Sequence, residues 1–145
     1  MKQPIGILIV EDSPAFVAKI HRQLRRARLS FHTRCIGSKD AFVRELECHR
    51  PDAILSNGGL PAFDGLAALA IAREKRPDVP FIFVAATAEE GFGQLPMDSV
   101  RPAGHLKSSL SDLAPTLREA LREAKRRREL LDAELMALTS RWMTQ

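Results

Sequence analysis

The chain has 145 residues, of which 45% are apolar and 28% are charged, and its formal net charge at pH 7 is +4. This length is one domain's worth of chain, and the composition is that of a folded soluble protein rather than a disordered one. The longest apolar runs are far too short to cross a bilayer, and the start lacks the charged and apolar regions of a signal peptide. We therefore expect a cytoplasmic protein without a membrane anchor, and so mild a charge does not establish nucleic-acid binding.

Short apolar runs alternate with amphipathic stretches along the chain. Nearly continuous runs rich in β-branched residues, such as Ile5–Val10, are typical of strands buried in a parallel sheet. The predicted strands are Ile5–Val10, Phe31–Ile36, Ala53–Ser56, Phe81–Ala85 and a short segment from His105 that ends at Lys107.

Three helices are predicted between these strands. The first has Ser13 as its N-cap and Pro14 at the first helical position. The second follows Ser38 over Lys39–Cys48, and the third is Leu66–Lys75. In the first two, the residues expected to point inward are Phe16, Val17, Ile20, Leu24, Phe42, Val43 and Leu46.

This alternation predicts an α/β fold in which helices cover both faces of a parallel sheet. Right-handed crossovers leave few topologies, and we expect a flavodoxin-like, doubly wound, five-stranded sheet of order 2-1-3-4-5.

From Gly91 to Gly104, glycine and proline are too frequent for a full helix, so the fourth helix is predicted to be degenerate. Sites in such folds lie at the carboxyl ends of the strands, which brings together Glu11, Asp12 and Asn57.

The last predicted element is a long helix from Ser111 to Met143, capped by Ser109 or Ser111 and with Pro115 in or near its first turn. Positions along it repeat at steps of four and three, which is the spacing of a coiled-coil seam. At 1.5 Å per residue the helix would be about 50 Å long, so a globular body can cover only its first half. The predicted seam residues are Leu117, Leu121, Ala124, Arg128, Leu131, Leu135, Leu138 and Trp142.

We therefore expect a globular domain at residues 1–121 and a helical extension at residues 122–145. The extension would form a coiled-coil homodimer or bind a partner helix, with Arg128 fixing register or partner choice at a cost in stability. The alternative is that it folds back on its own domain.

The basic run Lys125–Arg128 has the ordinary interpretation of a solvated helix face, and binding of nucleic acid or an acidic partner is a further alternative.

Cysteine and histidine usage indicates no metal site. Cys35 and Cys48 are not in a CxxC arrangement, and we predict that both are reduced, buried thiols. None of the four histidines has metal-ligand spacing.

Three segments carry a family pattern. Ile7–Ser13 is a strand followed by an acidic pair, Pro51–Pro61 is a strand and loop followed by Asp64-Gly65, and Lys107 follows the last short strand. Together they resemble the receiver domains of response regulators, over about Ile5 to Leu121. In that family two acids and an acceptor aspartate hold Mg²⁺, the aspartate takes a phosphoryl group from a histidine kinase, and a Thr or Ser and a Lys bind the phosphoryl oxygens.

The resemblance assigns Glu11 and Asp12 to the acidic pair, Asn57 to the acceptor, Ala85 to the Thr or Ser, and Lys107 to the lysine. An amide at Asn57 lacks the anionic oxygen that attacks phosphorus, although the sequence Asn57-Gly58 is prone to deamidation. Ala85 has no hydroxyl group, and Thr87, two residues further on, is the nearest one. A structural interpretation of the remaining charges is that Asp12 caps the first helix while Lys107 neutralises the acids.

The resemblance therefore implies an atypical receiver in two-component or phosphorelay signalling that acts without phosphorylation as a protein-interaction module. It would be no enzyme, would dimerise through its last helix, and would have a histidine kinase or an output protein as its signalling partner. No cofactor is expected beyond weak Mg²⁺ binding at Glu11 and Asp12. The alternative is a phosphoryl-accepting regulator with a substitute acceptor, for which the nearby candidates are Asp52, Ser56 and Thr87.

Overall fold

The computed structural model describes residues 3–57, 65–85 and 105–143. Its elements along the chain are β1 (Ile5–Val10), α1 (Pro14–Arg26), β2 (Phe31–Ile36), α2 (Lys39–Cys48), β3 (Ala53–Ser56), α3 (Gly65–Lys75), β4 (Phe81–Ala85), β5 (His105–Ser109) and α4 (Leu113–Met143). The predicted degenerate helix between Gly91 and Gly104 lies outside the described residues.

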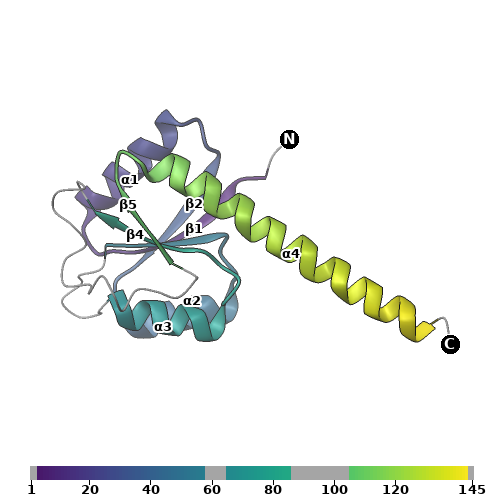
Figure 1. Ribbon diagram of the computed structural model, residues 1–145. Helices are drawn as coiled ribbons and strands as arrows, with labels where there is room; N and C mark the ends of the chain where they lie inside the picture. Colours follow the sequence, from purple (N-terminus) through teal and green to yellow (C-terminus); the bar gives the residue numbers. More distant parts are fainter. Residues whose placement is uncertain (1–2, 58–64, 86–104, 144–145) are drawn as a thin grey trace.

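The five strands form one parallel sheet of order β2-β1-β3-β4-β5, which confirms the predicted flavodoxin-like topology. Helices α1 and the first half of α4 cover one face of the sheet, and α2 and α3 cover the other (Figure 1). The second half of α4 projects away from this body as a single straight helix (Figure 1).

The sheet separates two hydrophobic cores, because successive side chains of a strand point to opposite faces. In β1, Ile7 and Ile9 join the core under α1 and α4, whereas Leu8 and Val10 join the core under α2 and α3. The central strands therefore read as continuous apolar runs. Phe42 and Leu46 of α2 are fully buried in the second core, as predicted.

Helix α1 begins as predicted. The Ser13 side chain accepts a hydrogen bond from the backbone N–H of Phe16 at 3.3 Å, and Pro14 is the first helical residue. Ile20 and Leu24 are buried in the core under α1 and α4, and Phe16 and Val17 are partly buried against it.

The prediction for the start of α4 was wrong by two residues. The helix begins at Leu113, and its first backbone hydrogen bond runs from the N–H of Thr116 to the carbonyl of Asp112 at 3.1 Å. Ser109 does not cap it, because β5 continues to Ser109, which pairs with Ala85, instead of ending at Lys107. The Ser111 hydroxyl lies 3.1 Å from that of Ser109 in the turn between β5 and α4.

The prediction of buried thiols was also wrong. Cys35 and Cys48 are free and exposed. Cys35 lies on β2, which is an edge strand with only one neighbour in the sheet, and Cys48 is the last residue of α2. Both positions leave the side chain outside the two cores.

No helix among the described residues combines the length and the apolar character that crossing a membrane requires.

Replacement of Leu117 by alanine should destabilise the fold strongly, because its side chain is fully buried between α4 and the sheet. The expected loss of unfolding free energy is about 2–5 kcal/mol, as for other buried leucines. The matched control is Leu130→Ala in the same helix, where the side chain is 59% exposed and the expected change is about 0.5 kcal/mol or less. Urea titrations of both variants measure the difference, and equal midpoints would show that α4 is not part of the folded unit.

Candidate functional site

The carboxyl edge of the sheet is the first candidate site. Val10 of β1 pairs with Ser56 of β3, and Ser56 pairs in turn with Phe83 of β4. Because parallel strands end at the same edge, the residues that follow Val10 and Ser56 leave the sheet side by side. The register thus brings the Glu11–Asp12 pair and Asn57 to one edge.

Glu11 is turned toward the start of α1. Its side chain is buried, and its Oε1 atom accepts hydrogen bonds from the backbone N–H groups of Asp12 and Ser13, both at 3.0 Å. Its Oε2 atom is buried and has no hydrogen-bond partner among the described residues. Glu11 therefore holds the turn between β1 and α1, which is a role that the sequence analysis missed.

The prediction that Asp12 caps the first helix was wrong, since Ser13 performs that function. Asp12 is exposed at the carboxyl edge. Its carboxylate is therefore in contact with solvent, one residue away from the buried carboxylate of Glu11.

The other predicted site residues differ in how they lie at this edge. Asn57 is exposed directly after β3, whereas Ser56 and Ala85 are buried at the ends of β3 and β4. The backbone of Lys107 pairs with Phe83 in the middle of β5. Thr87 lies outside the described residues.

The donor set at this edge fits a magnesium ion only in part. Mg²⁺ requires near-octahedral oxygen ligands. One oxygen of Glu11 already accepts two backbone N–H groups, and its other oxygen is buried. The remaining described side-chain oxygens at this edge are those of the Asp12 carboxylate and the Asn57 amide. Within residues 3–57, 65–85 and 105–143, no three His, Cys, Asp or Glu side chains are grouped so that they could hold a metal ion.

An open depression of about 390 Å³ adjoins this edge between α1 and β2, and its lining includes Glu11, Asp12, His21 and Cys35. Burial, and then the negative charge of Glu11, raise the pKa of the Cys35 thiol above its usual range. Burial, and then the positive charge of Arg25, lower the pKa of His21, whose Nε2 lies 2.9 Å from the Thr33 hydroxyl. Near neutral pH the thiol is therefore protonated and weakly nucleophilic.

Asp52 lies at the opposite edge of the sheet. Its Oδ2 atom accepts a hydrogen bond from the backbone N–H of Gly6 at 2.8 Å, next to the start of β3. This contact joins the amino ends of β1 and β3. Asp52 is thus separated from Asn57 by the length of β3.

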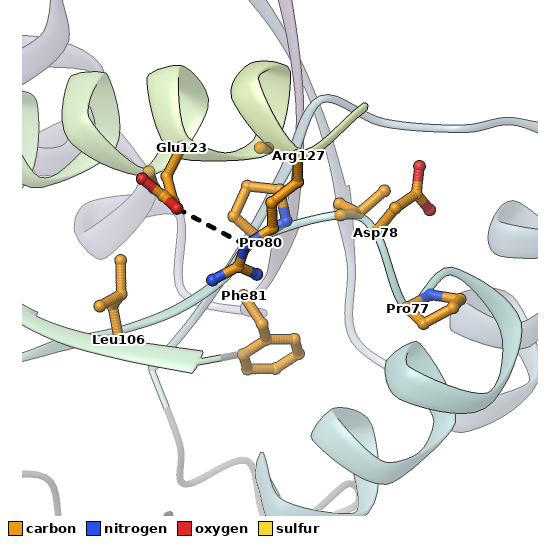
Figure 2. A pocket seen from close by; sticks show the side chains of 10 residues that line it. Pro77, Asp78, Pro80, Phe81, Leu106, Glu123 and Arg127 are labelled. Atoms are coloured by element: carbon orange, nitrogen blue, oxygen red, sulfur yellow. Dashed lines mark ion pairs between the residues drawn. The ribbon is translucent and has the colours of Figure 1, made fainter. Parts of the chain in front are cut away.

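Helix α4 forms the second candidate surface. A groove of about 120 Å³ lies between its middle turns and the amino ends of β4 and β5, with Pro80, Phe81 and Leu106 in its lining. Figure 2 shows Glu123 and Arg127 extending from α4 toward this groove, where their side chains form an ion pair at 3.7 Å.

Arg128, the interruption of the predicted seam, faces its own domain. Burial raises the pKa of Asp78, but the hydrogen bond from Arg50, the charge of Arg50 and the charge of Arg128 outweigh it, and the net pKa is lowered. Arg50 Nε donates to Asp78 Oδ2 at 2.9 Å. Arg128 is therefore close enough to Asp78 to be attracted by it, which explains a cation at an otherwise apolar position.

The basic run of α4 is largely matched by nearby acids. Arg126 and Arg127 both form ion pairs with Glu123, at 3.5 and 3.7 Å, and Arg128 faces Asp78. Such exposed pairs contribute little stability, but they reduce the positive field that nucleic-acid binding requires. This arrangement favours the interpretation as a solvated helix face.

Beyond Arg128 the apolar stripe of α4 has no cover within the described residues. The alternative that the extension folds back on its own domain was wrong, because the helix continues straight to Met143. The exposed fractions of Leu131, Leu135, Leu138 and Trp142 are 56%, 61%, 52% and 83%.

Comparisons with known proteins agree with this fold. The family model of the response regulator receiver domain matches residues 7–95. The sensor kinase CckA of Brucella abortus is 31% identical to the chain over 116 residues, which are 79% of this chain and 12% of the kinase. The chain therefore spans about an eighth of the length of that curated relative.

Solved receiver domains of sensor histidine kinases are similar in structure. One from Pseudomonas aeruginosa, with a magnesium ion coordinated in its active-site cleft, has a TM-score of 0.64 and 25% identity, covering 82% of this chain and 98% of that one. One from Syntrophus aciditrophicus has a TM-score of 0.64 and 26% identity, covering 83% and 92%.

The chain belongs to the response regulator receiver domain family, the receivers of two-component signalling.

Replacing Asn57 with aspartate should destabilise the protein when no metal is present, because a third carboxylate would join Glu11 and Asp12 at the carboxyl edge. With partial exposure the expected cost is about 1 kcal/mol, or a melting temperature lower by roughly 3 °C. Thermal unfolding in chelator measures this, with Asn57→Ala as the uncharged control. Mg²⁺ should recover part of the loss in Asn57→Asp only, and an unchanged or higher melting temperature for that variant in chelator would contradict the expected repulsion.

Proposed function

We propose that this chain is a receiver domain that signals by binding other proteins and takes up no phosphoryl group. The observation that carries the proposal is Asn57, whose amide follows β3 at the carboxyl edge. The reaction of a receiver requires an anionic oxygen that attacks phosphorus. An amide oxygen carries no charge and its nitrogen is a poor nucleophile, so the edge lacks the reacting group.

The surroundings of Asn57 support the same proposal. Ala85 has no hydroxyl group that could bind phosphoryl oxygens. One carboxylate oxygen of Glu11 already accepts hydrogen bonds from the backbone of the turn before α1. Phosphoryl transfer depends on positioning the phosphoryl group and on neutralising its negative charge. The residues at positions 57 and 85 and the hydrogen bonds of Glu11 therefore all weaken the same phosphoryl-transfer step. We expect Mg²⁺ binding to be weak and the domain to have no enzymatic activity.

Neither described substitute acceptor is well placed. Asp52 lies at the amino edge, where its carboxylate binds the Gly6 backbone, and Ser56 is buried within the sheet. The alternative of a phosphoryl-accepting regulator therefore depends on a residue outside the described part of the chain, such as Thr87.

The second part of the proposal concerns the partners. The apolar stripe of residues 131–142 would make the chain a homodimer through its helical extension, which we place at residues 122–145 after a receiver domain at residues 1–121. The similarity to receiver domains of sensor kinases favours a signalling partner, namely a histidine kinase or an output protein, in the cytoplasm.

Incubation with acetyl phosphate and Mg²⁺ should leave the intact mass of the protein unchanged, because no carboxylate stands at position 57. The Asn57→Asp variant, treated in parallel, tests whether the rest of the edge retains the chemistry. A phosphate adduct on the unmodified protein would overturn the proposal, and peptide mapping would then locate the acceptor. Mapping also separates a true substitute acceptor from aspartate formed by deamidation of Asn57.

Substitution of Leu135 by glutamate should convert the dimer to a monomer. Burying one such leucine contributes about 1.5–3 kcal/mol, so replacing it with a charge in both copies should weaken association by at least tenfold. Sedimentation velocity over a concentration series measures this. The matched control is Met136→Glu, which is the adjacent residue, 72% exposed and outside the stripe. A wild-type protein that remains monomeric throughout the series would contradict dimerisation.

A further inference from the structure

The exposed stripe of α4 lies on the same side of the helix as the residues that dock α4 to the sheet. At 3.6 residues per turn, the docking residues Leu113 and Leu121 and the stripe residues all lie within about 60° of the direction of Leu117. Leu113 and Leu117 are fully buried and Leu121 packs against the same core. The stripe residues are Leu131, Leu135, Leu138 and Trp142.

The globular domain of each molecule therefore blocks the amino-terminal end of its own stripe to a partner helix. Pro80, Phe81 and Leu106 lie beneath the middle turns of α4 (Figure 2). Arg128 is partly buried on the same side of the helix, and its charge lowers the pKa of Asp78. The free stripe begins at Leu131, immediately after the docked part of the helix. Any helix that pairs with the stripe has open space only from Leu131 toward the carboxyl end.

This geometry excludes a parallel pair of straight helices. In a parallel pair the first half of the partner's helix would run along residues 113–128, at the usual separation of 8–10 Å. That space is filled by the molecule's own sheet. A parallel arrangement would also place Arg128 of one copy against Arg128 of the other in the seam.

An antiparallel pair avoids both conflicts. Leu135 of one copy would lie opposite Leu138 of the second copy, and Leu131 would lie opposite Trp142 of the second copy. The two bodies would then stand at opposite ends of the paired segment, each beyond the stripe of the other. The helix is already formed and anchored by its docked half, so pairing does not require nucleation of a new helix.

The charges beside the stripe match the same register. In antiparallel coiled-coil geometry Glu134 of one copy faces Arg141 of the second copy, and two-fold symmetry repeats the contact. In a parallel pair Glu134 would face Thr139 instead. Glu134 and Arg141 are both exposed and flank the apolar stripe.

We propose that the partner of this stripe is a second copy of the chain, bound antiparallel over residues 131–142 with two symmetry-related Glu134–Arg141 pairs. The proposal rests on the dimerisation proposed above and adds its direction and register. It places the two carboxyl edges at the far ends of the assembly.

Single-cysteine variants test the direction. In a background of Cys35→Ala and Cys48→Ala, both of which replace exposed side chains, Leu131→Cys and Trp142→Cys are prepared separately. Mild oxidation of their mixture should give the mixed disulfide, identified by intact mass, in at least fivefold excess over either homodisulfide. The control mixture pairs Trp142→Cys with Leu130→Cys, which lies off the stripe, and should give little mixed product.

The outcomes separate this proposal from the previous one. A dominant Leu131→Cys homodisulfide would show a parallel dimer and overturn the antiparallel arrangement while leaving dimerisation intact. A dimer in sedimentation without the mixed disulfide would overturn it as well. A monomer in sedimentation would remove the dimer and this inference together.

Charge exchange supplies a second test without cysteines. Glu134→Arg and Arg141→Glu should each weaken the dimer about threefold to tenfold, and the double variant should return to near the wild-type affinity. Residues seven apart do not contact each other on one helix, so recovery reports a contact between copies. Glu129→Arg makes the same change of charge off the stripe and should leave the affinity within twofold. Failure of the double variant to recover would overturn the Glu134–Arg141 pairing.

Discussion

The docking of the first half of α4 on the sheet is the contact on which both candidate surfaces depend. Leu113 and Leu117 complete the core over β1, β3 and β4, which α1 covers only in part. The same contact sets the side of α4 that faces inward. Since the helix is straight, it also sets the direction of every apolar side chain beyond Arg128.

The two surfaces lie at opposite edges of the sheet. Asn57 and the acidic pair follow the carboxyl ends of the strands, whereas α4 leaves the body beside the amino ends of β4 and β5. Helix α4 itself connects them, starting close after β5 at one edge and projecting beyond the other (Figure 1).

The parallel register brings the strand ends together whatever residues stand there, so the receiver fold does not depend on the residues of its carboxyl edge. Glu11 has a local structural role at this edge, because its buried carboxylate stabilises the turn into α1 through two backbone hydrogen bonds. This structural role of the Glu11 carboxylate does not depend on a bound metal ion. The residues that a receiver needs for phosphoryl transfer and those that it needs for folding thus overlap only in part.

The local pattern was sufficient to predict most elements and the sheet order, since the strands are continuous apolar runs and the helices carry their own caps and inward stripes. It failed where the outcome depends on a neighbour in space. The exposure of Cys35 follows from the edge position of β2, and the late start of α4 follows from the pairing of Ser109 with Ala85. Helical spacing in the sequence also could not show why Arg128 interrupts the seam, because the acid that attracts it lies 50 residues earlier in the chain.

The sequence by itself determined the fold class, the amide at position 57 and the presence of an apolar stripe, because each depends on residue identity and spacing along one segment. Only the tertiary structure decided which part of the stripe is covered, and that Asp52 lies at the far edge from Asn57. These depend on contacts between segments distant in the chain, and their geometry exists only once the sheet has formed.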